Sequence, residues 1–243
     1  MENQRPSLSI FFPCYNDKGT IATMVLESKQ VAEKLTDDFE IIVIDDGSTD
    51  GSRELLQNLQ QDVSQLRLVF HEKNQGYGAA LRRGFKTAKK DLIFYTDGDA
   101  QYNVKELPLL FKKMTPDIDI VNGYKIKRSD PIHRVMVGAA YQCAMRLAFW
   151  LPIRDPDCDF RLIRRSVFDK INLISATGTI TIELVKKIQQ AGFRFAEVGV
   201  HHYFRVYGKS QFFNFTRVIK TLFKLVSLWF ELIIFKFADK KSI

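Results

Sequence analysis

Two aspartates and a glutamine lie within one short segment that directly follows an apolar run. The run Leu92–Tyr95 leads into "TDGDAQ", which carries Asp97, Asp99 and Gln101. Two carboxylates this close repel each other and lose hydration, so a bound cation is their natural counter-charge. Carboxylate and amide oxygens are hard ligands of the kind that Mg²⁺ and Mn²⁺ take in proteins. The segment therefore predicts a divalent metal site, while the residues alone leave open an ordinary polar turn.

Apolar runs alternate with segments of helical periodicity along the first half of the chain. Near-continuous apolar strands between helices are typical of an α/β protein whose mostly parallel sheet is covered on both faces. Ligands of such sheets bind beyond the carboxyl ends of the strands. The predicted strands are Leu8–Phe12, Phe39–Ile44, Leu66–Phe70, Leu92–Tyr95 and Ile118–Val121, and the predicted helices are Thr20–Leu35, Ser52–Gln60, Ala79–Ala88 and Val104–Met114.

Four polar or glycine-bearing loops follow these strands, and the predicted topology brings them to one rim. They read "PCYND", "DDGSTDGS", "HEKNQGYGAA" and "TDGDAQ". Asp45 and Asp46 suit hydrogen bonds to a nucleobase edge or a ribose hydroxyl, or the capping of the next helix. Gly76 and Gly78 stand at a helix start, where free N–H groups favour an anion, or they serve tight packing of the turn. The loop is neither a Walker A nor a G-x-G-x-x-G motif, which argues against ATPase chemistry and nicotinamide cofactors.

The charge of the chain is unevenly distributed. The 243 residues carry a net charge of +8. Residues 1–123 hold 15 Lys and Arg against 19 Asp and Glu, a net charge of −4, and residues 124–243 hold 21 against 9, a net charge of +12. A basic second half predicts an anionic partner there, such as phosphate, a membrane surface or nucleic acid.

The cysteines and the N-terminal residues bear on the compartment. The three cysteines are odd in number and far apart, which predicts reduced thiols in a cytosolic compartment. The first residues lack a basic stretch ahead of an apolar one, so we do not expect a signal peptide.

The motifs in their order resemble the family 2 glycosyltransferases of the GT-A fold. The segments that carry the resemblance are "FFPCYND", "IVIDDGSTDGS", "NQGYGAALRRGF", "YTDGDAQY" and "DCDFRLIRRSVF". Within that family they look most like the dolichol-phosphate mannose synthase and polyprenyl-phosphate glycosyltransferase group. The resemblance covers about residues 7–210 and implies inverting, metal-dependent transfer of a sugar, with mannose or glucose expected, from a nucleoside-diphosphate sugar to polyprenyl or dolichyl phosphate.

The resemblance assigns a nucleotide pocket and a metal site to the rim. Asp17 stands where the family's P-x-Y-N-E segment usually has Glu, so its shorter carboxylate reaches less far. Asp46 matches the residue that contacts the nucleoside. The expected nucleotide-binding residues are Pro13, Tyr15, Asp17, Ile44, Asp46, Gly76 and Asp97. Asp97, Asp99 and Gln101 match the D-x-D-x-Q metal motif, whose Mg²⁺ or Mn²⁺ bridges the donor diphosphate and stabilises the leaving group.

The acceptor side decides the subgroup. Arg134 matches an arginine that contacts the lipid phosphate, and Lys125 lies near a second such position where Arg is usual. Gly138 stands where the group commonly has Ser. The segment "HHYFRVYGKSQF" resembles the part that closes over the diphosphate and supplies Arg205 and Lys209. A solvated surface charge is the alternative for each of these cations.

Asp159 is the residue that keeps a second acceptor class open. A sugar hydroxyl needs a carboxylate base as it attacks, whereas a phosphate monoester with a second pKa of ~6 is already largely ionised. The subgroup often has Gly at this position, so Asp159 is a base, a contact to a donor-sugar hydroxyl, or a structural partner of Arg161. The alternative reaction is transfer to a saccharide or lipid-linked saccharide hydroxyl. The expected catalytic residues are Asp99, Arg134, Arg205, Lys209 and Asp159.

The C-terminal segment, residues 211–243, reads as an amphipathic helix that follows a catalytic domain of residues 1–210. Its longest uncharged stretch, Leu225–Phe230, is six residues, far below the ~18 of a spanning helix. Its polar residues form one narrow stripe: Arg217, Lys220, Lys224, Ser227 and Glu231. We expect peripheral attachment to the cytoplasmic face of a membrane. A helix docked on the catalytic domain, a homo-oligomer and a separate membrane subunit are the alternatives, and a nucleic-acid-binding module is the non-enzyme hypothesis.

Overall fold

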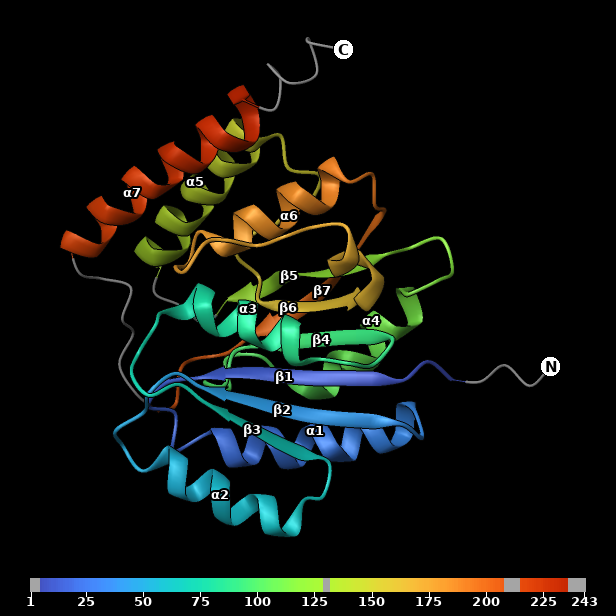
Figure 1. Ribbon diagram of the computed structural model, residues 1–243. Helices are drawn as coiled ribbons and strands as arrows, with labels where there is room; N and C mark the ends of the chain where they lie inside the picture. The colour runs from blue at the N-terminus through green and yellow to red at the C-terminus, as the bar shows by residue number, and fades with distance from the viewer. Residues whose placement is uncertain (1–4, 129–131, 208–214, 236–243) are drawn as a thin grey trace.

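The computed structural model describes residues 5–128, 132–207 and 215–235 and shows a seven-stranded sheet (Figure 1). The strand order is β3-β2-β1-β4-β6-β5-β7. Only β6 runs antiparallel to its neighbours, while the other paired strands are parallel. The strands are β1 (Leu8–Cys14), β2 (Phe39–Asp45), β3 (Leu66–Phe70), β4 (Leu92–Thr96), β5 (Ile120–Arg128), β6 (Phe160–Arg164) and β7 (Phe195–His202).

The apolar strand sequences follow from burial on both faces of the sheet. In β1, Ile10 and Phe12 belong to one buried cluster, and Phe11 between them belongs to the cluster on the other face. In β4, Phe94 and Tyr95 divide in the same way. Side chains alternate across a strand, so a strand covered on both faces is apolar at most successive positions.

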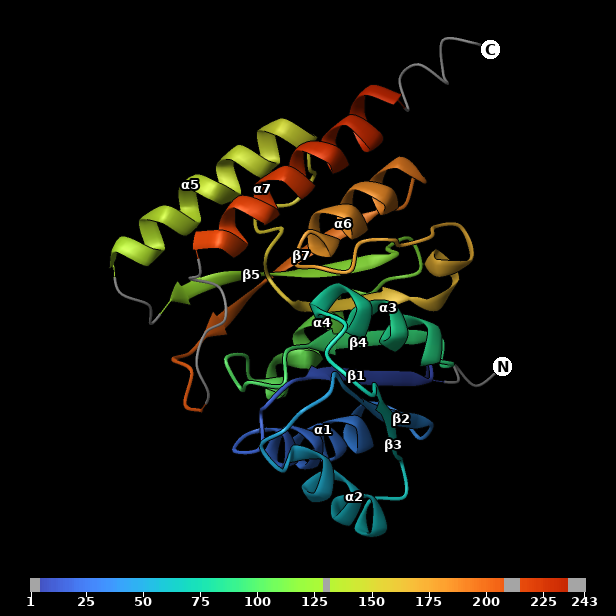
Figure 2. The ribbon, with the colours of Figure 1, turned by 60° about the vertical axis from the view of Figure 1, so that its left-hand side comes forward.

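Helices cover the sheet in two layers, as Figures 1 and 2 show from two directions. One layer holds α1 (Ile21–Leu35), α2 (Ser52–Asp62) and α4 (Leu107–Lys113), and the other holds α3 (Tyr77–Thr87) and α6 (Ile180–Gln190). Short 3₁₀ turns lie at Val104–Glu106 and Arg165–Asp169. The α/β class with a mostly parallel sheet flanked by helices is confirmed.

Helix α5 (Ile132–Phe149) and helix α7 (Phe215–Trp229) lie side by side next to α6 (Figures 1 and 2). A π-helical turn, Phe230–Phe235, continues α7. Leu225, Leu228 and Leu232 are buried in a third apolar cluster with Phe149 of α5 and Ile182 of α6. One side of the C-terminal helix therefore docks on the rest of the protein, which was one of the alternatives that the sequence left open.

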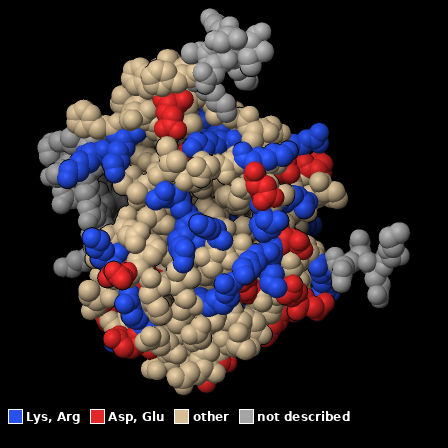
Figure 3. Space-filling view, viewed as in Figure 1, with Lys and Arg blue, Asp and Glu red and all other residues tan. Residues whose placement is uncertain are grey.

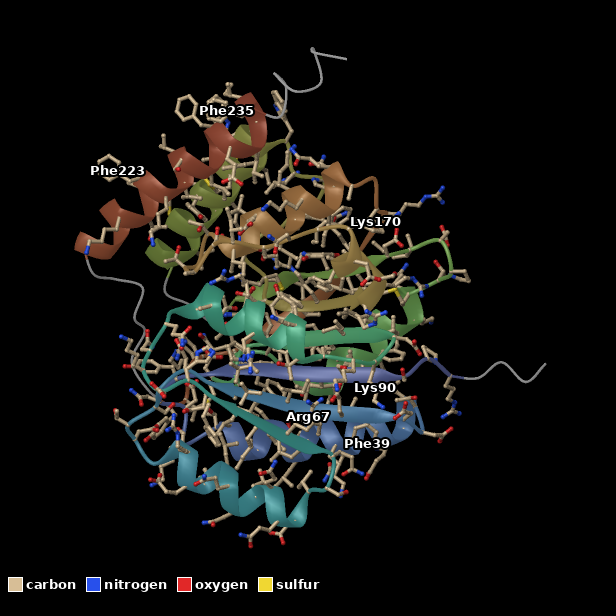
Figure 4. The ribbon with its side chains drawn as sticks, in the orientation of Figure 1. Phe39, Arg67, Lys90, Lys170, Phe223 and Phe235 are labelled. Atoms are coloured by element: carbon tan, nitrogen blue, oxygen red, sulfur yellow. The ribbon has the colours of Figure 1, made fainter. Side chains whose placement is uncertain are left out.

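A second apolar side of α7 is exposed to solvent. Leu222, Phe223, Val226 and Phe230 are exposed, and we call these four residues the outer apolar stripe. Figure 4 shows Phe223, with Phe235 beyond the stripe, pointing away from the body of the protein. None of the described helices is long and apolar enough to cross a membrane.

The sequence did not predict β6 and β7, and the reason lies in their polar residues. β6 reads "FRLIR", and Arg161 in its middle is fully buried against Tyr95 and Asn122. A charged residue paired inside the core cannot be recognised from apolar periodicity. The predicted strand Ile118–Val121 is also longer and runs as Ile120–Arg128.

Several cations gather on one face of the molecule, and three of them belong to α3. Figure 3 shows Lys and Arg side chains across the middle of this face. Arg82, Arg83 and Lys86 of α3 line a hollow of about 360 Å³ there, together with His71 and Gln75.

The three cysteines are unpaired, as expected.

Candidate active site

The loops after β1, β2 and β4 are joined at one rim. The Thr20 hydroxyl, at the start of α1, donates to the carbonyl of Gly98 over 2.7 Å. The Thr49 N–H donates to Asn16 Oδ1 over 2.8 Å, which ties the β2 loop to the β1 loop. Parallel strands end together at this edge, so the fold gathers the polar loops as the sequence predicted.

A cluster of buried carboxyl groups lies at this rim. Burial, together with the neighbouring carboxylates of Asp159 and Asp99, raises the pKa of Asp97 well above its usual range. Burial also raises the pKa of Asp99, against the opposing effect of Arg205. Asp17 of the β1 loop is 8% exposed, and burial raises its pKa to about 6. This part of the protein therefore holds more negative charge than its own cations neutralise.

The segment after β7 closes against the Asp99 side of this cluster. The Arg205 guanidinium pairs with Asp99. The Gln101 side-chain amide donates to the Tyr203 carbonyl over 3.1 Å, and the Tyr203 N–H donates to the Gln101 carbonyl over 2.8 Å. The structure thus brings Arg205 to the predicted metal motif. Lys209 lies outside the described residues.

The donor set fits a divalent cation that completes its coordination from a substrate. Asp97 and Asp99 offer two hard carboxylates in a buried, negatively charged place, as Mg²⁺ and Mn²⁺ prefer. In the part of the chain that the structure describes, no three His, Cys, Asp or Glu side chains form a closed metal site. Two carboxylates leave positions open for phosphate oxygens.

Asp46 is held within the protein by the loop after β3. Its carboxylate accepts the N–H groups of Gln75 over 2.8 Å and Gly76 over 2.9 Å. His71 Nδ1 lies 2.7 Å from the same carboxylate. The carboxylate therefore shapes the β3 loop, and its contact with a nucleoside stays a prediction.

The glycines of this loop are used for close packing. Gly76 has a φ of +96°, and a Cβ there would lie 2.6 Å from the Ala176 carbonyl oxygen. The Gly78 N–H donates to that carbonyl over 3.1 Å. Both glycine N–H groups thus have partners inside the protein, which is the packing role that the sequence left open.

The other expected nucleotide-binding residues lie in or beside the first two strands. Pro13 is buried in β1, and its carbonyl oxygen borders Gly98. Tyr15 is 39% exposed at the rim. Ile44 is fully buried in β2 within the apolar core, so its side chain is a packing element.

A second polar cluster surrounds Lys125, which the sequence assigned to the acceptor phosphate. Lys125 Nζ lies 3.3 Å from Asp155 and donates to the Asp157 carbonyl over 2.9 Å. The Gln142 amide of α5 donates to Asp155 over 2.6 Å. Burial raises the pKa of Asp157 to about 6. Lys125 is thus already paired, and its contact with a lipid phosphate remains a prediction.

Asp159 sits where the carboxyl cluster meets the core. Its Oδ1 lies 3.7 Å from Arg161 Nη1 and 3.3 Å from the Tyr95 hydroxyl. Burial raises the pKa of Asp159, while Arg161 opposes that effect. The sequence left three roles open for Asp159, and the structure shows the contact with Arg161. The roles as a base and as a contact to the donor sugar stay predictions. Arg134 lies on α5, but its side chain is outside the described part of the structure.

Comparison with known proteins decides the family. A family model described as Glycosyl transferase family 2 matches residues 9–172, more than half of the chain. The chain belongs to glycosyl transferase family 2. The matched range of this family 2 protein runs from β1 past β6 and includes Asp97, Asp99 and Asp159, while Arg205 and α7 lie beyond it.

Curated relatives of this family 2 protein include two transferases that act on a polyprenyl phosphate by name. They are the undecaprenyl-phosphate 4-deoxy-4-formamido-L-arabinose transferases of Salmonella choleraesuis (strain SC-B67) and Aeromonas hydrophila, each 28% identical over 221 residues. The alignments cover 90% of this chain and 66% and 67% of the relatives. The chain thus spans about two thirds of their length.

Solved structures confirm the GT-A type of fold for this family 2 protein. Glucosyl-3-phosphoglycerate synthase from Mycobacterium tuberculosis, in complex with Mn²⁺, uridine diphosphate and glucosyl-3-phosphoglycerate, matches with a TM-score of 0.66 and 20% identity. That match covers 84% of this chain and 73% of the other. The same enzyme with Mn²⁺ and uridine-diphosphate-glucose matches with a TM-score of 0.66 and 18% identity, over 85% and 73% of the two chains.

Two residues of the site were missed in the sequence of this family 2 protein. His71, the partner of Asp46, directly follows the apolar run of β3, and this position was the available signal. Tyr77 donates its hydroxyl hydrogen to Asp97, but as the first residue of α3 between two glycines it looked like part of a packing loop.

Proposed function

We propose that this family 2 protein is an inverting, metal-dependent glycosyltransferase that moves a sugar from a nucleoside-diphosphate sugar to polyprenyl phosphate at a membrane surface. The observation that carries the proposal is the pair Asp97 and Asp99 at the rim, where burial and the neighbouring carboxylates raise the pKa of Asp97 and, among the described residues, only Arg205 pairs with Asp99. The undecaprenyl-phosphate transferases support the acceptor. The synthase complex with Mn²⁺ and uridine diphosphate supports a metal and a nucleotide donor.

Asp97 and Asp99 would hold the cation. When bound there, Mg²⁺ or Mn²⁺ offsets the charge of the donor diphosphate and of the leaving nucleoside diphosphate. Arg205 of the segment after β7, which pairs with Asp99, would contact the same diphosphate. Inversion follows from a single displacement, in which the acceptor attacks the anomeric carbon on the face opposite to the leaving group.

A phosphate acceptor needs no catalytic base, and this agrees with the carboxylate of Asp159 being held by groups of the protein. A phosphate monoester with a second pKa of ~6 attacks without losing a proton. The carboxylate of Asp159 is held near Arg161 and Tyr95 and needs no role in proton transfer. The expected donors carry mannose or glucose, and the curated relatives add 4-deoxy-4-formamido-L-arabinose as a candidate sugar.

A second candidate function is transfer to a saccharide or lipid-linked saccharide hydroxyl. The observation that favours it is Asp157, because a carboxyl group with a pKa of about 6 is suited to general-base catalysis near neutral pH. In that reaction Asp157 would accept the proton of the attacking hydroxyl.

The membrane part of the proposal rests on α7. Its outer apolar stripe remains exposed after the helix has docked. Lys220 and Lys224 belong to the polar side of the same helix, and cations beside exposed aromatic side chains suit an anionic leaflet. We propose peripheral attachment to the cytoplasmic face of the membrane that holds the lipid acceptor.

The test is a radiolabelled transfer assay on the full chain. It uses polyprenyl phosphate in detergent, Mn²⁺ or Mg²⁺, and GDP-mannose, UDP-glucose and nucleotide-linked 4-deoxy-4-formamido-L-arabinose as donors. Metal-dependent labelling of the lipid should disappear in Asp99→Ala and persist in Asp62→Asn, which changes an exposed aspartate at the end of α2. Labelling of a saccharide in place of the lipid, lost in Asp157→Asn, would establish the second candidate instead.

A further inference from the structure

Tyr77 connects the predicted metal site to the interior of the protein. Its hydroxyl donates to Asp97 Oδ1 over 2.8 Å. A carboxylate has two oxygens, so this bond occupies one of them and leaves the other for a cation. The bond also fixes the rotation of the carboxylate about its last side-chain torsion, which is otherwise broad.

The backbone around Tyr77 is clamped. Its two neighbours, Gly76 and Gly78, lie against the segment Ser175–Thr177, where an added Cβ at Gly78 would be 2.5 Å from the Ser175 carbonyl oxygen. The Gly78 N–H also donates to Ala176. The tyrosine ring itself packs against the apolar cluster under α3 and α6. Its hydroxyl therefore has little freedom to move away from Asp97.

A second carboxylate lies close to both groups. Together with burial, the charge of Asp159 raises the pKa of the Tyr77 hydroxyl and of Asp97. Asp159 is in turn held by Arg161 and by the Tyr95 hydroxyl. Arg161 is fully buried, and its Nε bonds Asn122 while its Nη2 bonds the Pro156 carbonyl. This chain of contacts ends in the sheet and is independent of Arg205, which holds Asp99.

We propose that Tyr77 is a positioning residue for the metal ligand Asp97, that the charge of Asp159 adds to the attraction for the cation, and that neither residue is a catalytic base. The inference rests on the proposed function, because it needs a cation at Asp97. Groups that hydrogen-bond a metal ligand orient it and raise its affinity for the metal, and their removal typically costs about 10- to 100-fold in affinity. Asp159 then belongs to the site because its charge lies beside Asp97, and it needs no contact with the sugar.

The experiment measures Mn²⁺ binding to the full chain by the EPR signal of free Mn²⁺, first with Mn²⁺ alone and then with UDP or GDP added. Tyr77→Phe keeps the ring in the core and removes only the hydroxyl, so we expect its Mn²⁺ dissociation constant to rise by about 10- to 100-fold. Asp159→Asn should raise it by about 10-fold. Thr87→Val removes a hydroxyl at the opposite end of α3, where it donates to the Arg83 carbonyl, and should leave the constant unchanged.

Transfer kinetics then separate positioning from base catalysis. A positioning role predicts that Asp159→Asn and Tyr77→Phe raise the Mn²⁺ concentration for half-maximal rate, while saturating Mn²⁺ restores most of kcat. A base at Asp159 predicts a loss of kcat at every Mn²⁺ concentration, with Mn²⁺ binding unchanged. That second pattern would overturn the proposal.

The outcomes also distinguish this proposal from the one on which it rests. If the wild-type chain binds Mn²⁺ no better than Asp97→Asn, with and without nucleotide, the metal-dependent function itself is wrong and the positioning role falls with it. If the wild type binds Mn²⁺ and Tyr77→Phe binds it equally well, only the positioning role is wrong. Should Tyr77→Phe fail to fold, judged by its thermal unfolding, Tyr77→Met takes its place, because it also removes the hydroxyl and keeps an apolar side chain against the core.

Discussion

The outer apolar stripe of α7 gives the most direct test of membrane attachment. Phe223 is 72% exposed and Phe230 is 46% exposed. Fully burying a phenylalanine stabilises by about 1.5–3 kcal/mol, so transferring the exposed parts of both rings into a lipid interface should contribute about 2–3 kcal/mol. At about 1.4 kcal/mol per tenfold change, the double variant Phe223→Ser/Phe230→Ser should bind vesicles about 30- to 150-fold more weakly.

The assay is cosedimentation of the full chain with vesicles of neutral lipid and with vesicles that also contain anionic lipid. The matched control is Leu26→Ser/Leu109→Ser, which removes two exposed apolar side chains, 43% and 45% exposed, from α1 and α4 in the other helix layer. Both double variants should keep the thermal stability of the wild type because the changed side chains are exposed. Lys220 and Lys224 should make binding to anionic vesicles sensitive to salt.

Equal sedimentation of Phe223→Ser/Phe230→Ser and the wild type would refute the proposal that the outer apolar stripe of α7 binds a membrane. The oligomeric state then decides what covers the stripe. Light scattering after size exclusion would show a larger species for the wild type, lost in the same double variant, if a second copy packs there.

Three further predictions concern the stability of the fold. Gly84→Ala should lower the free energy of unfolding by about 1–3 kcal/mol in urea titrations, because its Cβ would lie 2.3 Å from the buried ring of Phe11, whereas Gly178→Ala, with open space around it, should not. Asp157→Asn should stabilise the protein by about 1–2 kcal/mol at pH 7 and by much less at pH 4. Burial raises the pKa of Asp157 to about 6, so the wild type loses stability as the pH rises to 6 and the carboxyl group ionises. An equal gain in stability at both pH values would contradict this prediction. Glu183→Gln should destabilise the protein at pH 7. Burial alone would raise the pKa of the Glu183 carboxyl, but Lys187 and two backbone N–H groups outweigh burial and hold this pKa below its usual value. The wild type should therefore lose stability as the pH falls below ~4.5. The variant should be less stable than the wild type by about 1–3 kcal/mol at pH 7, and it should lack this loss of stability at low pH.

Local sequence was sufficient where each residue's role depends on its neighbours along the chain. The strands β1 to β4 are apolar at successive positions because both faces of the sheet are covered, and their loops carry the polar residues that face the rim. Asp97 and Asp99 could therefore be singled out as a candidate metal motif before their surroundings were known. The helical nature of α7 followed from its narrow polar stripe.

Other features depend on residues that are distant in sequence. Tyr77 contacts Asp97 across 20 positions and Arg205 contacts Asp99 across 106, and no periodicity signals such pairs. Asp46 was expected to face a nucleoside, but its carboxylate also holds the β3 loop through two N–H groups and His71. The three open roles of Asp159 could be narrowed only once Arg161 and Tyr95 were seen beside it.

The sequence by itself determined the family, the α/β class and the residue types at the rim, because these follow from local apolar patterning and short motifs. Only the tertiary structure decided which charges have partners. Burial makes an unpaired carboxylate costly, so the carboxyl groups at the rim differ in role according to the groups packed against them. Asp99 meets Arg205, Asp97 meets Tyr77, and Asp159 meets Arg161, and each of these contacts joins segments that the chain brings together only when it folds.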